Sequence, residues 1–144
     1  MSMTLRVSDA MTTELHCIRP DREIMGAAHR LVTLNISGLL VVDARDVLVG
    51  ILTERDCIGV VLQAGYFDET AGRVADYMST ELQTIDASSS LMDVAERFAH
   101  GSHRRYPVLD ADRLVGVIAR RDILRALTSG AWFAAPAENR SMPK

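Results

Sequence analysis

Two short motifs in this chain combine a carboxylate with a predicted helix start, which could bind a ribose and a phosphate. The first spans residues 50–56, Gly-Ile-Leu-Thr-Glu-Arg-Asp, where a strand is predicted to end at Leu52 and a helix to begin at Thr53. A helix N-terminus offers free N–H groups to a phosphate, and the Asp56 carboxylate can accept hydrogen bonds from both ribose hydroxyls. Thr53 and Asp56 equally fit a helix cap and a first-turn acid, so both interpretations stay open.

The second motif, residues 116–122, has Ala119 where the hydroxyl is expected but keeps the acid, Asp122. This favours the ribose interpretation slightly, because the acid is present without its capping partner. Arginines could supply the phosphate donors that Ala119 lacks, although a solvated rim of the same residues is equally consistent. The arginines concerned are Arg104, Arg105, Arg120 and Arg121.

No other side chains are spaced for catalysis or for a metal centre. The chain has no phosphate loop of the Gly-Lys-Ser/Thr type and no Ser/His/Asp or Cys/His set. His100 and His103 are three residues apart but have no third ligand nearby. The two cysteines, Cys17 and Cys57, are predicted to be small buried apolar side chains rather than a disulfide. We therefore expect no metal and no catalytic residues.

Both motifs belong to a unit that the chain contains twice. Residues 7–43 align with residues 74–110, and twelve of these 37 pairs are identical. The offset of 67 becomes 66 after one residue is lost from a loop, and then aligns the two motifs. A unit of about 60 residues buries too little surface to be robustly stable alone. We therefore expect the two copies to pack together, through their sheets.

Each copy predicts the order strand, helix, strand, strand, helix after a short helical turn, which makes the fold class α+β. The turns are expected at 7–11 and 74–78, and the N-caps of the first helices at Asp21 and Ser88. Gly65 and Gly130 are expected to end the last helices. The strands are predicted at residues 15–18, 39–42 and 47–52, and again at 82–85, 106–109 and 114–118.

Over residues 5–129 the sequence resembles a tandem pair of cystathionine-β-synthase (CBS) domains, the unit called a Bateman module. Three motifs carry the resemblance: Val-x-Asp-x-Met-(Thr/Ser) at the start of each copy, Val-(Val/Leu)-Asp after the second strand, and Gly-h-h-(Thr/Ser)-x-x-(Asp/Asn), where h is an apolar residue. It implies a pseudo-symmetric pair of β-α-β-β-α repeats with two clefts between them. The predicted boundaries are 5–66 and 72–130 for the repeats and 131–144 for a C-terminal tail.

The resemblance also implies a ligand with an adenosyl group: AMP, ADP, ATP, S-adenosylmethionine or NAD. The family's acid holds the ribose and its hydroxyl helps to hold phosphate. Relatives usually have proline in the second strand, which Pro107 matches and Leu40 does not. The implied binding residues are Cys17, Ile18, Gly38, Leu39, Thr53, Arg55 and Asp56 in the first copy, and Thr84, Ile85, Arg105, Tyr106, Pro107, Arg120, Arg121 and Asp122 in the second. By the resemblance, the adenine pocket would be lined by residues 17–18 and 38–39 in the first copy and by residues 84–85 and 106–107 in the second.

By resemblance the chain is a regulatory module and not an enzyme. It should need no cofactor besides its adenosyl regulator and should signal in trans to an unidentified protein; a ligand-free dimerisation module is the alternative. The net charge of −3 does not favour nucleic acid as a partner, and no membrane span or signal peptide is visible, so a cytoplasmic protein is expected. A homodimer is predicted, because apolar residues of the closing helices need cover. They are Ile58, Val61, Leu62, Ile123, Leu124 and Leu127.

Overall fold

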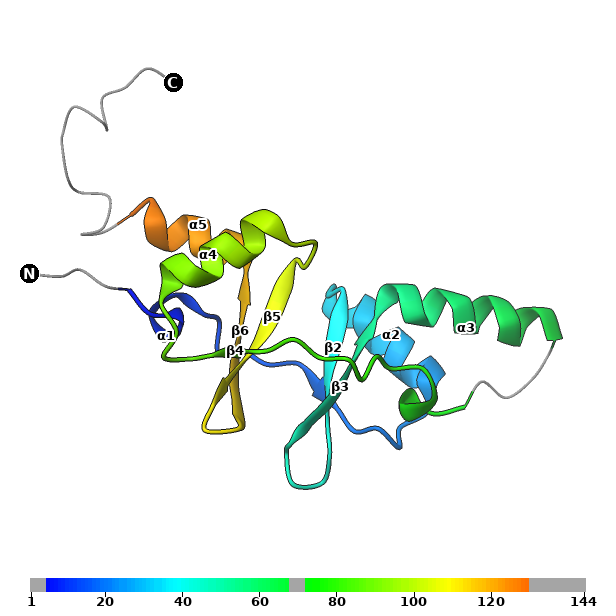
Figure 1. Ribbon diagram of the computed structural model, residues 1–144. Coiled ribbons are helices and arrows are strands. Elements are labelled where there is room, and N and C mark those ends of the chain that lie inside the picture. The colour runs from blue at the N-terminus through cyan, green and yellow to red at the C-terminus, as the bar shows by residue number, and fades with distance from the viewer. Residues whose placement is uncertain (1–4, 68–71, 130–144) are drawn as a thin grey trace, which may run out of the picture. The chain divides into compact units, whose positions relative to one another are not determined.

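The computed structural model describes residues 5–67 and 72–129, which form two compact units (Figure 1). Residues 15–67 and 72–82 make one unit, called here the Thr53 unit. Residues 5–14 join residues 83–129 in the other, called here the Asp122 unit. Each unit has one three-stranded sheet with helices, which confirms the predicted α+β class.

The Thr53 unit is built on a sheet with the strand order β1-β2-β3. Strand β1 is parallel to β2, and β2 forms an antiparallel hairpin with β3. Apolar side chains from the sheet and from α2 and α3 make its core, including Leu31, Leu39, Leu52 and Val60. The elements are β1 (Cys17–Ile18), α2 (Ile24–Leu34), β2 (Gly38–Val42), β3 (Leu48–Thr53), α3 (Glu54–Phe67) and the 3-10 turn η1 (Val74–Asp76).

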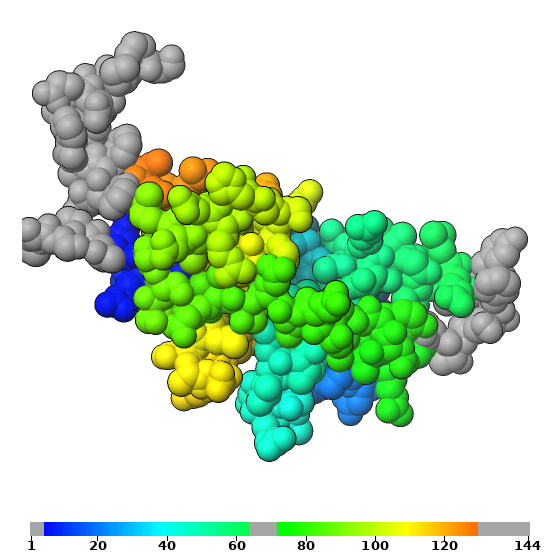
Figure 2. Space-filling model, in the orientation of Figure 1, coloured from blue at the N-terminus to red at the C-terminus, as the bar shows by residue number. Residues whose placement is uncertain are grey.

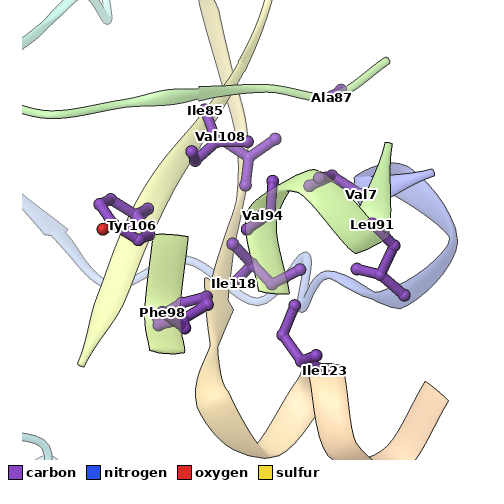
Figure 3. Close-up of a cluster of buried hydrophobic side chains, with 10 residues drawn as sticks. All are labelled: Val7, Ile85, Ala87, Leu91, Val94, Phe98, Tyr106, Val108, Ile118 and Ile123. Atoms are coloured by element: carbon purple, nitrogen blue, oxygen red, sulfur yellow. The ribbon is translucent and has the colours of Figure 1, made fainter. Parts of the chain in front are cut away.

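The Asp122 unit repeats this arrangement with the strand order β4-β5-β6. Its core gathers Leu91, Val94 and Phe98 of one helix against Val108 and Ile118 of the hairpin (Figure 3). In both units the tip of the hairpin protrudes at the surface, cyan in one and yellow in the other (Figure 2). The elements are α1 (Val7–Ala10), β4 (Ile85–Asp86), α4 (Leu91–His100), β5 (Arg105–Asp110), β6 (Arg113–Ala119) and α5 (Arg120–Leu127).

The opening turn of each sequence repeat packs into the unit that contains the other repeat's sheet. Val7 has no exposed surface and belongs to the Asp122-unit core, while Val74 is equally buried in the Thr53-unit core. Thr12 pairs with Val117, and a Cβ added at Gly116 would lie 2.9 Å from the Thr12 carbonyl oxygen. The glycine therefore permits the close approach of the opening segment. A compact unit and a sequence repeat are thus different stretches of chain.

The predicted caps of the first helices are wrong by two residues. Helix α2 begins after Glu23 rather than Asp21, and α4 begins after Ser90 rather than Ser88. Glu23 forms a β-bridge with Arg73 and Ser90 forms one with Arg6, so the backbone stays extended up to these residues. The Glu23 carboxylate then caps α2 by accepting the N–H groups of residues 25 and 26 at 2.9 and 3.0 Å.

The predicted end of the long helix is also wrong. Helix α3 continues through Gly65 to Phe67. A single glycine weakens a helix interior but does not stop a helix unless the backbone turns left-handed there. Gly130, the predicted end of the last helix, lies outside the described residues, as does the predicted tail.

Candidate functional site

The junction of β3 and α3 has the geometry of a reciprocal helix cap. The Thr53 N–H and hydroxyl both donate to Oδ2 of Asp56, at 2.9 and 3.0 Å. The Asp56 N–H donates back to Thr53 Oγ1 at 3.3 Å. Both donors use one carboxylate oxygen, and among the described residues Oδ1 of the half-buried Asp56 has no hydrogen-bond partner. Capping therefore leaves one carboxylate oxygen able to accept a further hydrogen bond.

The start of β2 converges on the same junction. Gly38 pairs with Thr53 in the β2–β3 ladder, and the Glu54 N–H donates to the Ser37 carbonyl at 2.9 Å. A Cβ at Gly38 would lie 3.3 Å from the Leu52 carbonyl oxygen, so the backbone is close here. The structure thus brings Gly38, Thr53 and Asp56 together. Because several first-turn N–H groups already have partners, the helix offers fewer of them to a phosphate than predicted.

The other predicted residues of the first copy lie elsewhere in the Thr53 unit. The side chains of Ile18 and Leu39 are buried in the core, and Arg55 is exposed on the first turn of α3. Cys17 lies on β1 and pairs with Leu40 of β2. Strand β2 lies between β1 and β3 in the sheet. The structure therefore does not place Cys17 beside Thr53.

Both cysteines are free thiols. Cys57 is buried as predicted, and Cys17 is half-buried. Burial is the main reason why the pKa of each thiol is raised; nearby carboxylates raise it further, Asp46 for Cys17 and Asp56 for Cys57. Each thiol is therefore protonated at neutral pH.

The corresponding carboxylate of the Asp122 unit is fully engaged within that unit. Asp122 is only 6% exposed, and its Oδ2 accepts the Ala119 N–H at 2.8 Å. Its Oδ1 accepts from the Thr12 hydroxyl at 3.4 Å and from Arg125 Nη1 at 3.1 Å. Neither Thr12 nor Arg125 was among the predicted site residues. Arg125 could have been predicted from its three-residue spacing from Asp122 on one helix. The Thr12 contact could not, because the sequence does not show that the opening turn of the first repeat packs in the Asp122 unit.

An arginine takes the place of Gly38 in the Asp122 unit. Arg105 pairs with Ala119 in the β5–β6 ladder, as Gly38 pairs with Thr53 in the other unit. The second unit thus has an arginine and an alanine where the first has a glycine and a threonine. Arg120 and Arg121 are exposed on the first turn of α5.

The predicted adenine-contacting residues of the second copy mainly pack within their own unit. Tyr106 is buried, with its ring centroid 5.0 Å from that of Phe98. Figure 3 shows these two side chains. The Tyr106 centroid also lies 4.9 Å from that of His103. Arg97 lies over the same ring at 4.8 Å. Ile85 and Pro107 are also buried, and Thr84 is half-buried just before β4. The buried side chains contribute to the core.

Within residues 5–67 and 72–129, no three His, Cys, Asp or Glu side chains are grouped to hold a metal ion. His103 instead stacks on Tyr106. No helix in the described parts of the chain is both long and apolar enough to span a membrane.

The two units define a duplicated α+β module in which each hairpin leads into a helix with an acid in its first turn. The model of the CBS domain family matches residues 7–63 and 74–129. The chain therefore belongs to the CBS domain family.

Several relatives share both repeats. The CBS domain-containing protein YhcV of Bacillus subtilis is 34% identical over 117 residues, which cover 81% of this chain and 81% of that protein. CBSX2 of Arabidopsis thaliana, solved in complex with AMP, has a TM-score of 0.73 and 30% identity over 84% of this chain and 94% of that one. The CBS pair of protein MJ0100, solved with 5′-methylthioadenosine and S-adenosylmethionine, has a TM-score of 0.70 and 26% identity, with coverage of 86% and 96%.

Proposed function

We propose that this chain is a regulatory module that binds an adenosyl ligand through the Thr53–Asp56 junction. The observation that carries the proposal is the Asp56 carboxylate, which caps α3 with one oxygen and keeps Oδ1 for a ligand. AMP in the CBSX2 complex and S-adenosylmethionine in the MJ0100 complex support the adenosyl class. No further cofactor and no catalytic role are proposed.

In this proposal each residue at the junction contacts a different part of the ligand. Asp56 accepts hydrogen bonds from the ribose, and Thr53 with the guanidinium of Arg55 faces the phosphate. Gly38 allows the ligand to approach the start of β2. The Asp122 unit is the weaker candidate, because Asp122 already accepts three hydrogen bonds. There, Arg105, Arg120 and Arg121 favour phosphate binding over ribose recognition.

Ligand-dependent stabilisation tests the proposal. A ligand at 100 times its dissociation constant stabilises the folded state by about 2.7 kcal/mol, which is roughly 5–10 °C in Tm for a chain of this size. We expect such a shift from AMP, ADP, ATP, S-adenosylmethionine or NAD, measured by differential scanning calorimetry. Mass spectrometry of small molecules released from the purified protein provides an independent check. If no compound shifts Tm and none co-purifies, the sensor proposal fails.

A ligand-free dimerisation module is the second candidate, and an exposed apolar stripe on α3 favours it. Ile58, Val61 and Leu62 are 60%, 42% and 68% exposed, while Cys57 and Val60 face the core. The matching prediction for the last helix is wrong for Ile123 and Leu127. Both pack against their own unit's core because they lie on the sheet-facing side of α5, and only Leu124 stays exposed.

We propose that two copies of the chain pair through this stripe on α3, since a self-complementary patch favours a twofold dimer. We expect a dimer in sedimentation velocity at tens of micromolar. The double change Ile58→Glu and Leu62→Glu should give a monomer of unchanged helix content, because both side chains are exposed within their unit. The control is Val32→Glu on α2, which is also exposed and should leave the dimer intact. A wild-type monomer would contradict the proposal.

Signalling in trans to a regulated protein follows from the regulatory role. A ligand that binds one conformation more tightly shifts the population toward it, and a partner can then recognise that state. The cytoplasmic location and the repeat boundaries at 5–66 and 72–130 also stay predictions.

A further inference from the structure

A cavity of about 580 Å³ lies in the Thr53 unit, away from the Thr53–Asp56 junction. It is bounded by the end of β1, the first half of α2, the end of β2 at Val42 and the hairpin turn at Asp46. Gly38 and Thr53 pair at one end of the β2–β3 ladder, whereas Val42 pairs with Leu48 at the other. The cavity is therefore a separate feature, and its volume is typical of small-molecule sites.

Three arginines and two acids line this cavity, so the positive side chains outnumber the negative ones by one. Glu23 accepts N–H groups at the start of α2, and Asp46 pairs with Arg19 at 3.3 Å. Arg30 Nη1 donates to the Cys17 carbonyl at 2.8 Å, which leaves four of its five N–H donors. Among the described residues the guanidinium of Arg22 has no partner. The cavity thus presents positive charge with unused hydrogen-bond donors.

The free edge of β1 adds a backbone donor. The Leu40 N–H donates to the His16 carbonyl, so the backbone N–H and C=O groups of His16 point toward β2. The backbone groups of the next residue, Cys17, therefore point toward the outer edge of the sheet. The Arg30 bond to the Cys17 carbonyl agrees with this orientation. The Cys17 N–H is directed to the same edge as its carbonyl. Because burial raises the pKa of the Cys17 thiol, the thiol adds no negative charge to the cavity at neutral pH.

A glycine keeps the wall of the cavity open. Gly26 lies inside α2, where glycine is a poor helix former. A Cβ at this position would meet only Glu23 Oε1, at 3.7 Å, so packing within the unit does not require glycine. The second copy has no such set of residues: Arg19, Arg22 and Gly26 align with Asp86, Ser89 and Asp93. Of the three arginines only Arg30 has an arginine counterpart, Arg97, so this combination of residues is specific to the first copy.

We propose that this cavity binds the phosphate group of a small organic phosphate, held by Arg22, Arg30 and the Cys17 N–H. Guanidinium groups bind phosphate through charge-assisted hydrogen bonds. The apolar floor formed by Ile18 and Ala27 gives room for the organic part. This site is independent of the proposed adenosyl site, with which it shares none of these three groups.

The test is titration of the full chain with inorganic phosphate and with phenyl phosphate, followed by NMR of backbone amides and arginine Nε–H groups. We expect saturable shifts at Cys17, Gly26 and Arg22, with phenyl phosphate binding more tightly than phosphate. Arg22→Gln and Arg30→Gln should each weaken binding about tenfold. Arg113→Gln removes the same charge from the Asp122 unit and should leave the affinity unchanged.

A steric pair of variants completes the test. Gly26→Leu should abolish the shifts, whereas Gly59→Leu should not, because a Cβ at Gly59 on α3 meets nothing within 4 Å. If Gly26→Leu does not fold, the arginine variants decide. Shifts that do not saturate, shifts confined to Thr53 and Glu54, an equal loss in Arg113→Gln, or phenyl phosphate binding no tighter than phosphate would each overturn the proposal. The probes carry no adenosyl group, so failure here leaves the proposed adenosyl site untouched.

Discussion

Changing Val7 to aspartate should destabilise the protein by at least about 4 kcal/mol, the range of the most severe single substitutions. Val7 has no exposed surface and belongs to the core cluster of the Asp122 unit, whose members Leu91 and Ile118 lie far along the chain (Figure 3). The change removes an apolar side chain from the core and places an unpaired carboxylate there. Urea unfolding measures the loss. Ser8→Asp, on the exposed neighbouring residue, is the control and should change stability by less than about 0.5 kcal/mol.

Local hydrogen exchange tests whether the opening turn of each repeat packs in the unit that contains the other repeat's sheet. Val7→Ala, which should keep the fold, is expected to raise hydrogen exchange in β5 and β6 and not in β2 and β3. Val74→Ala should do the reverse, because Val74 lies in the core of the Thr53 unit. If Val7→Ala instead loosened β2 and β3, the assignment of the opening turns to the two units would be wrong.

The packing of each opening turn in the unit with the other repeat's sheet is also the main feature that could not be predicted from the sequence. The helices and strands follow from apolar periodicity, a local property that the residue order reveals. Which sheet an opening turn packs against is a long-range choice. Gly50 and Gly116 hint at close backbone approach but do not name the segment that approaches. For the same reason the bridges that extend the backbone to Glu23 and Ser90 displaced both predicted helix caps.

The candidate site was predictable where it depends on local spacing. Thr53 and Asp56 are three residues apart at a strand-to-helix junction, and the structure joins them as that spacing implies. The engagement of Asp122 was not predictable, because its partner Thr12 lies 110 residues away. Residues predicted to contact adenine, such as Tyr106, are apolar and suit a core equally well. Residue type alone cannot distinguish a pocket wall from a core.

The contrast between the two carboxylates makes the sharpest functional prediction. Asp56→Ala should weaken binding of whichever adenosyl compound stabilises the protein by about ten- to a hundredfold. That loss corresponds to roughly 1.5–3 kcal/mol for hydrogen bonds to a charged acceptor. Asp122→Ala should have little effect on that affinity but should lower stability, because it leaves the Ala119 N–H without its cap. Isothermal titration calorimetry on both folded variants gives affinity and stoichiometry together.

Asp56→Asn separates ribose binding from capping. An amide oxygen can still accept the Thr53 N–H, so capping alone predicts a small loss of stability and unchanged affinity. A ribose needs acceptors for two hydroxyls while the cap already occupies one oxygen of this side chain, and the amide's NH₂ group cannot accept a hydrogen bond. Asn should therefore lose affinity nearly as strongly as Ala while retaining most of the stability. If affinity and stoichiometry stay unchanged in the Asp56 variants and in Asp122→Ala, neither carboxylate holds the ligand, and α3 is capped at Thr53 for stability alone.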